Sequence, residues 1–272
     1  MTFFIKKIFF IKILIFFNFF SYSENFPTGA RSTSMANASV TFCDIWALSH
    51  NQAGIAFLKH KSLAFHFENH FLLKEHSLKS IFFVYPTNMG NFGLNYYNFG
   101  YSKYNISKIG IAYAKSFSEK FSFGLQLNYF NTYIESNIKN QGVINFEFGF
   151  LMKISDNLSF GTHIFRPKKS KIENYENENL STILKFGLSY NIQKKIIFCL
   201  EAEKDIKYKQ NLKFGMEYNY KNNIFLRMGI FTNPNFYSYG IGFVFKKFKT
   251  DIAFSKHPIL SYSSHISVNY EF

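Results

Sequence analysis

The chain has 272 residues with a formal net charge of +14, and aromatic residues make up 21% of it. The positive charge is scattered rather than gathered in a basic stripe with exposed aromatic residues, which argues against a nucleic-acid partner. The two cysteines, Cys43 and Cys199, are too far apart in the sequence for a metal-binding motif, and a disulfide between them depends on geometry that the sequence does not give.

The first 23 residues have the features of a secretory signal peptide. Lys6 and Lys7 give a basic start, an apolar run covers 8–20, and residues 21–23 precede a mature start at Glu24. The apolar run is short and interrupted by a lysine, and no later segment is apolar enough for a membrane-spanning helix. We therefore expect an exported protein that can enter a membrane only as a β-barrel.

The next segment, residues 24–60, does not alternate between apolar and polar side chains as a strand does. It contains apolar runs at 47–48 and 55–58, which are unfavourable when exposed to water. A barrel of medium size has a lumen that can hold such a segment. We predict that residues 24–60 form a short N-terminal hatch, or plug, seated in a barrel formed by residues 61–272.

Alternation dominates the rest of the chain. Every second residue from Leu212 to Tyr220 is large and apolar, so a strand there has one apolar and one polar face. Such alternation hides an apolar surface behind a mean hydropathy close to zero. Alternation and turn residues together predict about fourteen strands of ~9–11 residues. They lie near 61–68, 77–85, 91–99, 104–115, 120–131, 143–154, 157–166, 181–191, 194–205, 210–221, 224–232, 236–246, 248–256 and 263–272. The segment 77–85 alternates poorly.

The connections between these strands alternate in length. Tight polar turns are predicted at 118–120, 155–157, 193–195, 221–223 and 246–247. Two of the connections between them, Thr132–Gly142 and Pro167–Leu180, are long. Short periplasmic turns and longer external loops are typical of outer-membrane barrels. We therefore predict an all-β, antiparallel transmembrane β-barrel in the outer membrane of a Gram-negative cell, with both termini on the periplasmic side.

Charged residues within the strands lie on the face opposite the large apolar ones. A charge facing lipid near the middle of the membrane costs about 2–4 kcal/mol, so we expect these residues to face the lumen. They are Glu147, Lys153, Lys185, Glu201, Glu203, Lys213, Glu217, Arg227 and Asp251. Both signs occur, which favours a salt-bridged interior over a channel selective for one sign of ion.

Glycines share the predicted lumen face. They are Gly110, Gly124, Gly149, Gly161, Gly187, Gly215, Gly229 and Gly240. They either sharpen the curvature of the strands or leave room for something inside the barrel, and the sequence leaves both explanations open.

The last strand ends on an aromatic residue, with Tyr270 and Phe272 on its apolar face. We interpret these two residues as a C-terminal insertion signal for the barrel assembly machinery. Outer-membrane lipid is then the other expected partner.

Short motifs in the hatch resemble the N-terminal region of the PorV/PorQ proteins of Bacteroidetes. Residues 29–32 (Gly-Ala-Arg-Ser) and 35–38 (Met-Ala-Asn-Ala) are similar to their mature N-terminus. Residues 44–48 (Asp-Ile-Trp-Ala-Leu) and 51–54 (Asn-Gln-Ala-Gly) resemble a following motif, usually Asn-Pro-Ala-Gly, that is shared with FadL-type fatty-acid transporters. The resemblance implies a fourteen-stranded barrel and a set of hatch residues. These are Gly29, Ala30, Arg31, Met35, Trp46, Asn51, Ala53 and Gly54.

The resemblance implies two possible functions. A PorV/PorQ-like barrel is an accessory or interaction component of the type IX secretion system, with a secretion-system or periplasmic protein as partner. The alternative is a FadL-like barrel through which a small hydrophobic compound crosses the outer membrane passively, with the hatch as gate. Short external loops and the mixed-charge lumen favour the secretion role.

No residue pattern points to catalysis. The sequence has no set of Ser, His and Asp, no glycine-rich phosphate loop and no cysteine cluster, and Glu201 and Glu203 fit a solvated lumen. We expect a non-enzyme without a cofactor.

Histidines gather early in the chain, at His50, His60, His66, His70 and His76. His66 and His70 have a spacing suited to zinc on a helix, but on a strand they stand well apart. We therefore expect no metal site. In the hatch, Arg31 is expected to pair with a lumen carboxylate such as Glu147 or Glu217, or else to pack the plug as Trp46 does.

Overall fold

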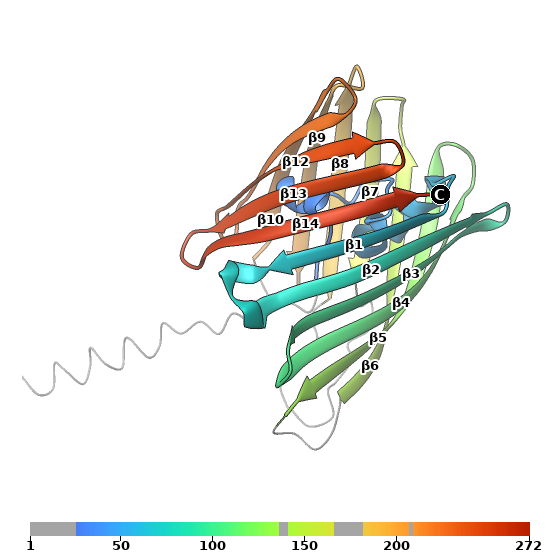
Figure 1. The fold of residues 1–272 in the computed structure, drawn as a ribbon. Coiled ribbons are helices and arrows are strands. Elements are labelled where there is room, and N and C mark those ends of the chain that lie inside the picture. The colour runs from blue at the N-terminus through green and yellow to red at the C-terminus, as the bar shows by residue number, and fades with distance from the viewer. Residues whose placement is uncertain (1–25, 136–140, 166–181, 207–208) are drawn as a thin grey trace, which may run out of the picture.

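The computed structural model describes residues 26–135, 141–165, 182–206 and 209–272. Fourteen antiparallel strands follow one another around a closed barrel, and the first strand pairs with the last (Figure 1). The predicted fold class is therefore confirmed. The strands are β1 (Ser62–Asn69), β2 (Ser77–Thr87), β3 (Gly90–Tyr101), β4 (Tyr104–Ser116), β5 (Phe121–Ile134), β6 (Gln141–Lys153), β7 (Leu158–Phe165), β8 (Ile183–Ile192), β9 (Ile196–Asp205), β10 (Asn211–Tyr220), β11 (Ile224–Phe231), β12 (Phe236–Phe245), β13 (Phe248–His257) and β14 (Ser261–Glu271).

The two ends of the barrel differ. We call one the turn end; it carries the C-terminus and the connections at 88–89, 117–120, 154–157, 193–195, 221–223 and 246–247. The opposite, loop end carries the short 3-10 helices η2 (His70–Leu72) and η3 (Lys74–His76) between β1 and β2. The predicted loop Thr132–Gly142 is shorter than expected, because β5 continues to Ile134 and β6 begins at Gln141. The predicted loop at 167–180 and the predicted signal peptide lie outside the described residues.

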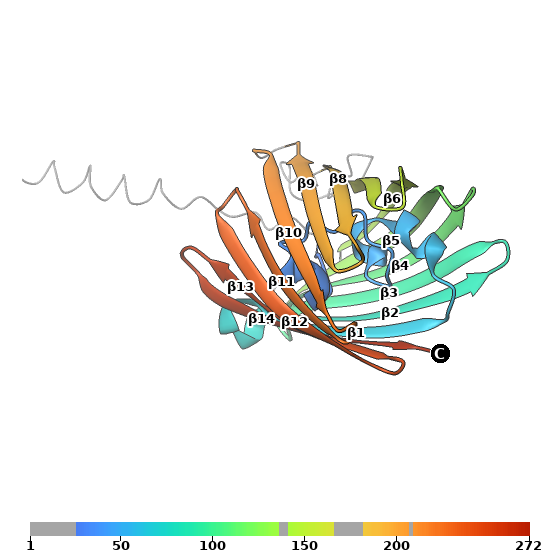
Figure 2. The same ribbon diagram turned by 90° about the horizontal axis from the view of Figure 1, so that it is seen from above.

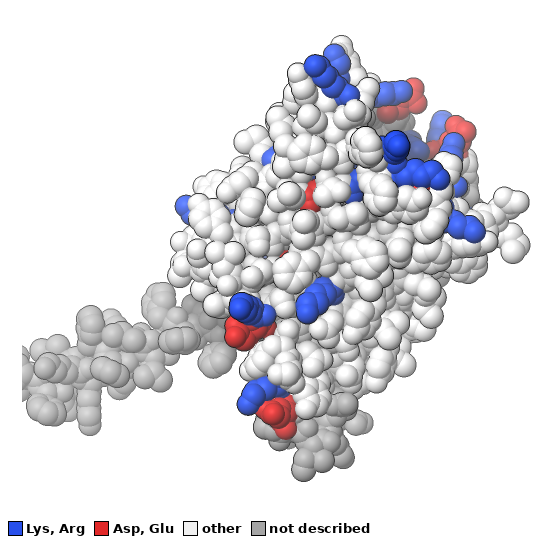
Figure 3. Space-filling model, viewed as in Figure 1, with Lys and Arg blue, Asp and Glu red and all other residues white. Residues whose placement is uncertain are grey.

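The outer face of the barrel is apolar. On β4, Ile109 and Ile111 point outward and are 53% and 57% exposed, while Lys108 and Ala112 point inward and are buried. Figure 3 shows a broad uncharged band on the wall, with charged side chains mostly toward its two ends. Because a closed barrel pairs its backbone groups between strands, this surface can face lipid without an open sheet edge.

Strand β2 explains why the segment 77–85 alternates poorly. Its inner face carries Phe82 and Val84, both fully buried, and its outer face carries Ile81 and Tyr85. The inner residues are apolar because they pack against the N-terminal segment, where Trp46 meets Phe82 at 5.1 Å between ring centroids. A strand with apolar contacts on both faces loses the period-two pattern.

The N-terminal segment lies inside the ring of strands (Figure 2). It contains the short helices α2 (Ala30–Ser34) and α3 (Ala47–His50) and the 3-10 helix η1 (Gln52–Phe57). Most of its side chains between Phe26 and Ile55 are buried, as expected for a plug. Among the described residues, no helix has both the length and the hydrophobicity to cross a membrane.

Candidate functional site

The hatch lies directly against glycines of the inner wall. A Cβ atom on Gly229 of β11 would lie 2.4 Å from the backbone nitrogen of Ala36, and one on Gly149 of β6 would lie 2.1 Å from Asn51 Oδ1. The same close approach to the hatch occurs at Gly124, Gly161, Gly187, Gly215 and Gly240. Of the two explanations for the lumen glycines, the structure therefore favours room for the hatch.

Arg31 on α2 joins the hatch to the wall through a chain of ion pairs. Its Nε and Nη2 donate to the two carboxylate oxygens of Glu217 at 2.9 and 2.8 Å, and its Nη1 donates to Asp44 at 2.9 Å. Arg227 donates to the same Glu217 at 2.5 Å and to Asp251 at 2.6 Å. Of the two carboxylates predicted for Arg31, the structure selects Glu217. Such bidentate contacts fix orientation as well as charge.

Glu147 is the centre of a second polar cluster, on the other side of the hatch. One oxygen accepts from Lys108 Nζ at 3.0 Å and from Asn128 Nδ2 at 2.7 Å. The other accepts from Gln52 Nε2 at 2.6 Å, and His163 Nε2 lies 3.1 Å from it. Gln52 stands where the resembling motif has proline, so this departure gives the hatch a side-chain hydrogen bond to the wall.

A third polar cluster holds the middle of the hatch through its backbone. Glu201 accepts from the backbone nitrogens of Ser39 and Val40, both at 2.9 Å. Lys213 pairs with Glu201 at 3.0 Å and with Glu203 at 2.7 Å, and Lys185 lies 3.6 Å from Glu203. The charged side chains of the lumen thus form ion pairs with one another and ion pairs or hydrogen bonds with the hatch.

The remaining predicted residues are placed as follows. Lys153 points inward, with its Nζ 3.9 Å from the ring centroid of Phe57 on η1. Gly29 has a φ of 100°, which a residue with a side chain rarely adopts, and it also lies against Trp46, which leaves no room for a Cβ atom. Tyr270 packs between Phe248 and Phe272 at 4.8 and 4.9 Å. The other hatch positions, Ala30, Met35, Asn51, Ala53 and Gly54, are buried in the lumen.

Lys108 and His163 also face the lumen, although neither is among the residues predicted from the sequence. Lys108 sits opposite the outward Ile109 and Ile111, so the alternation that identified other charges could have found it. Cys43 and Cys199 are both free thiols.

Burial of His50 in the hatch makes the docking of the hatch sensitive to acid. His50 Nε2 donates to the backbone oxygen of Thr28 at 2.8 Å, and burial lowers the pKa of His50 well below its usual value. Because exposed histidine protonates near pH 6.5 and the docked His50 does not, docking of the hatch should weaken as the pH falls below about 6.5. Trp46 is the single tryptophan and reports on the hatch. Its accessibility to acrylamide should rise between pH 7.5 and 5, and a His50→Gln variant with the same pH dependence would contradict this assignment.

An apolar cluster lies inside the wall at the loop end. We define it by buried, inward-facing residues near the loop ends of β3, β4, β5, β7 and β8: Phe99, Ile106, Phe130, Phe165 and Ile183. Phe26 of the hatch stacks on Phe99 at 5.1 Å between ring centroids. The apolar cluster borders the Glu147 cluster, where Lys108 Nζ lies 5.4 Å from the ring centroid of Phe130.

Comparisons with known proteins identify the fold. No protein-family model matches the sequence, and a search of curated proteins finds no match. Among solved structures, the chain is similar to the Ralstonia pickettii toluene transporter TbuX (12% identity, 92% of this chain and 99% of that one, TM-score 0.68).

It is also similar to the monoaromatic hydrocarbon channel CymD (11% identity, 90% of this chain and 97% of that one, TM-score 0.67). A Pseudomonas aeruginosa FadL homologue matches as well (12% identity, 91% of this chain and 99% of that one, TM-score 0.62). These comparisons do not single out the PorV/PorQ proteins. The chain has the barrel fold of FadL-type transporters and hydrocarbon channels.

Proposed function

We propose that this chain is an outer-membrane barrel through which a small hydrophobic compound passes, with the N-terminal hatch as gate. The observation that carries the proposal is the apolar cluster inside the barrel wall at the loop end, which packs against Phe26 of the hatch. An ion or sugar gains nothing from such a surface, whereas an apolar molecule leaving water does. The shared fold with a toluene transporter and a hydrocarbon channel supports this choice.

The same observations weaken the case for a type IX secretion role. That role was favoured by the mixed charges of the lumen, which the structure pairs with one another and with the hatch. They need no protein partner to satisfy them. The comparisons name transporters and channels, and a secretion role gains no support from them.

The proposal includes the remaining expectations about location and assembly. Residues 1–23 direct export, residues 24–60 form the hatch and residues 61–272 form the barrel. The barrel assembly machinery recognises the last strand through Tyr270 and Phe272. The protein is not an enzyme in this proposal, and outer-membrane lipid surrounds the assembled barrel.

Replacing Ile106 by Asp tests the apolar cluster. Cells that lack their own transporter of this fold should take up radiolabelled toluene or oleate faster when they produce this protein. The Ile106→Asp variant should lower that gain at least about tenfold. A carboxylate beside an apolar compound is unfavourable, and a cost of about 1.4 kcal/mol already corresponds to a factor of ten. Ile106→Leu, which keeps the apolar surface, is the matched control. Uptake of both compounds no faster than in cells with an empty vector would refute the proposed function.

A further inference from the structure

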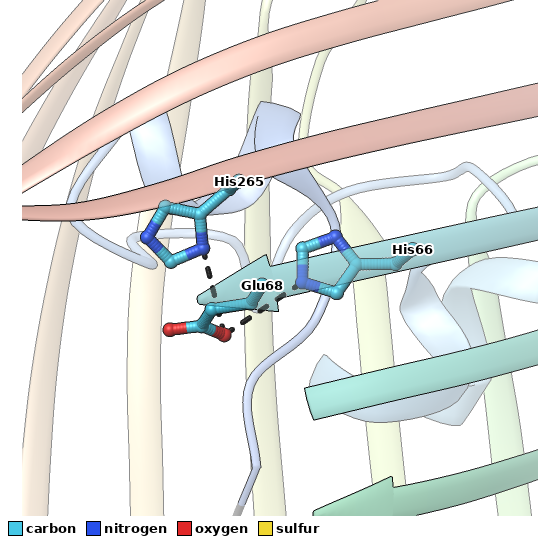
Figure 4. Close-up of side chains that lie close together, drawn as sticks. All are labelled: His66, Glu68 and His265. Carbon is cyan, nitrogen blue, oxygen red and sulfur yellow. Dashed lines mark ion pairs between the residues drawn. The ribbon is translucent and has the colours of Figure 1, made fainter. Parts of the chain in front are cut away.

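Three titratable side chains meet on the inner wall where the barrel closes. His66 and Glu68 come from β1 and His265 from β14, and Figure 4 shows them pointing toward one another. Their side chains are 0%, 5% and 3% exposed. The group lies toward the loop end of β1, which ends at Asn69.

The hydrogen-bonding capacity of this group is not met by the protein. Both ring nitrogens of His66 and Nδ1 of His265 are buried and have no hydrogen-bond partner among the residues that the structure describes. Glu68 Oε2 lies 3.7 Å from His66 Nε2 and 3.5 Å from His265 Nδ1, which is longer than a normal hydrogen bond. A buried polar nitrogen without a partner costs about 1–3 kcal/mol, so these nitrogens indicate that something else binds there.

The spacing of the donor atoms suits a metal ion. One ligand atom from each of the three residues lies within 4.8 Å of the others. Bonds of about 2.0–2.2 Å to a tetrahedral zinc ion place its ligand atoms ~3.3 Å apart. Glu68 Oε2 is close to this spacing from both imidazoles, at 3.7 and 3.5 Å, whereas the two imidazole nitrogens need only lie within 4.8 Å of each other and would move together around the ion. We propose that His66, Glu68 and His265 bind a divalent transition-metal ion of the zinc class. Two imidazoles favour such an ion over Ca²⁺ or Mg²⁺, which prefer oxygen ligands.

Neighbouring groups orient these ligands as outer partners do in metal sites. Ser255 Oγ lies 3.0 Å from His265 Nε2, so it can accept a hydrogen bond from a protonated Nε2 and leave the Nδ1 lone pair facing Glu68. A lone pair and a carboxylate facing each other repel unless a cation lies between them. On the other side, His70 Nε2 lies 2.8 Å from Glu68 Oε1 and fixes the carboxylate.

The site has a structural consequence. A bound ion would link β1 to β14, the two strands that close the barrel. It would also fix His66, whose ring packs at 5.9 Å against that of Trp46 in the hatch. The ion would therefore stabilise both the closure of the barrel and the seating of the hatch.

Zinc binding by the folded barrel tests this proposal. The protein in detergent is treated with a chelator, freed of it, and titrated with Zn²⁺ by calorimetry. We expect one Zn²⁺ per barrel. His66→Gln and His265→Gln should each weaken binding by more than about 100-fold, and Ser255→Ala by about 10–100-fold, as outer partners do. His76→Gln, an exposed histidine at the same end, should leave binding unchanged.

Heat-modifiable gel migration shows which variants have folded. If a ligand variant fails to fold, Co²⁺ bound to the wild-type chain provides the second measurement, since mixed imidazole and carboxylate ligation in a closed site gives visible absorption bands of tetrahedral cobalt. Competition by Zn²⁺ should remove these bands. The proposal is wrong if the folded wild-type barrel binds less than one Zn²⁺, or if His76→Gln weakens binding as much as His265→Gln does.

Discussion

Replacing Glu147 by Leu is expected to destabilise the folded barrel by about 3–5 kcal/mol, the range seen when one partner of a buried ion pair is removed. Glu147 is 1% exposed and accepts from Lys108, Asn128 and Gln52. The substitution leaves the Lys108 ammonium in the interior beside aromatic rings, which offset only part of its lost hydration. Reversible urea unfolding in lipid vesicles measures the change.

A double variant separates the charge effect from simple loss of packing. In Lys108→Met with Glu147→Leu, both charges are gone and apolar groups of similar volume replace them. Such replacements are often neutral or stabilising, so the double variant should recover most of the lost free energy of unfolding. If it is as unstable as Glu147→Leu alone, the ion pair is not what holds this part of the lumen.

Replacing Gly229 by Leu should release the part of the hatch around Met35 and Ala36 from the barrel wall. The added Cβ would lie 2.4 Å from the backbone of Met35 and Ala36, and backbone atoms cannot turn aside as a flexible side chain can. Overpacking of this kind costs about 1–3 kcal/mol or more, and displacement of the hatch relieves it. Trypsin cleavage after Arg31, followed by mass spectrometry, should then be at least about tenfold faster than in the wild-type barrel.

Met228→Leu is the matched control, since Met228 lies on the same strand, points outward and is 57% exposed. It should leave cleavage after Arg31 unchanged. A released hatch should also raise ion conductance through a planar bilayer, because the glycines and charges that it covers would then line an open lumen. Unchanged cleavage in Gly229→Leu, with the barrel folded, would show that the hatch does not depend on this contact.

Strand positions were predictable because a barrel wall imposes a local rule. Side chains must alternate between lipid and lumen, so Leu212 and Tyr218 point outward while Lys213 and Glu217 point inward. The rule fails where both faces are apolar, as at Phe82 on β2. There, the inner contact is with Trp46, a residue far away in the sequence.

The contacts of the lumen residues with the hatch were not predictable, because they depend on where the hatch, which is distant in the sequence, lies inside the barrel. The sequence left Arg31 a choice between Glu147 and Glu217, and only the placement of α2 against β11 to β14 decides for Glu217. The glycines are similar: their place on the lumen face is local, whereas the contact that seven of them make with residues 34–53 is not, and Gly110 meets Asn95 and Asn128 of the wall instead.

The histidines show the same limit most clearly. In the sequence, His66 and His70 have a spacing that suits a zinc site on a helix. On a strand these two residues stand well apart, which argues against such a site. Closure of the barrel brings His265 beside His66 from the opposite end of the chain. The sequence by itself determined the strands and their two faces, and it showed that the N-terminal segment has apolar runs that must be buried. Each of these follows from the local chemistry of neighbouring side chains. Only the tertiary structure decided what the lumen contains and which side chains meet there, because barrel closure joins residues that no sequence pattern relates.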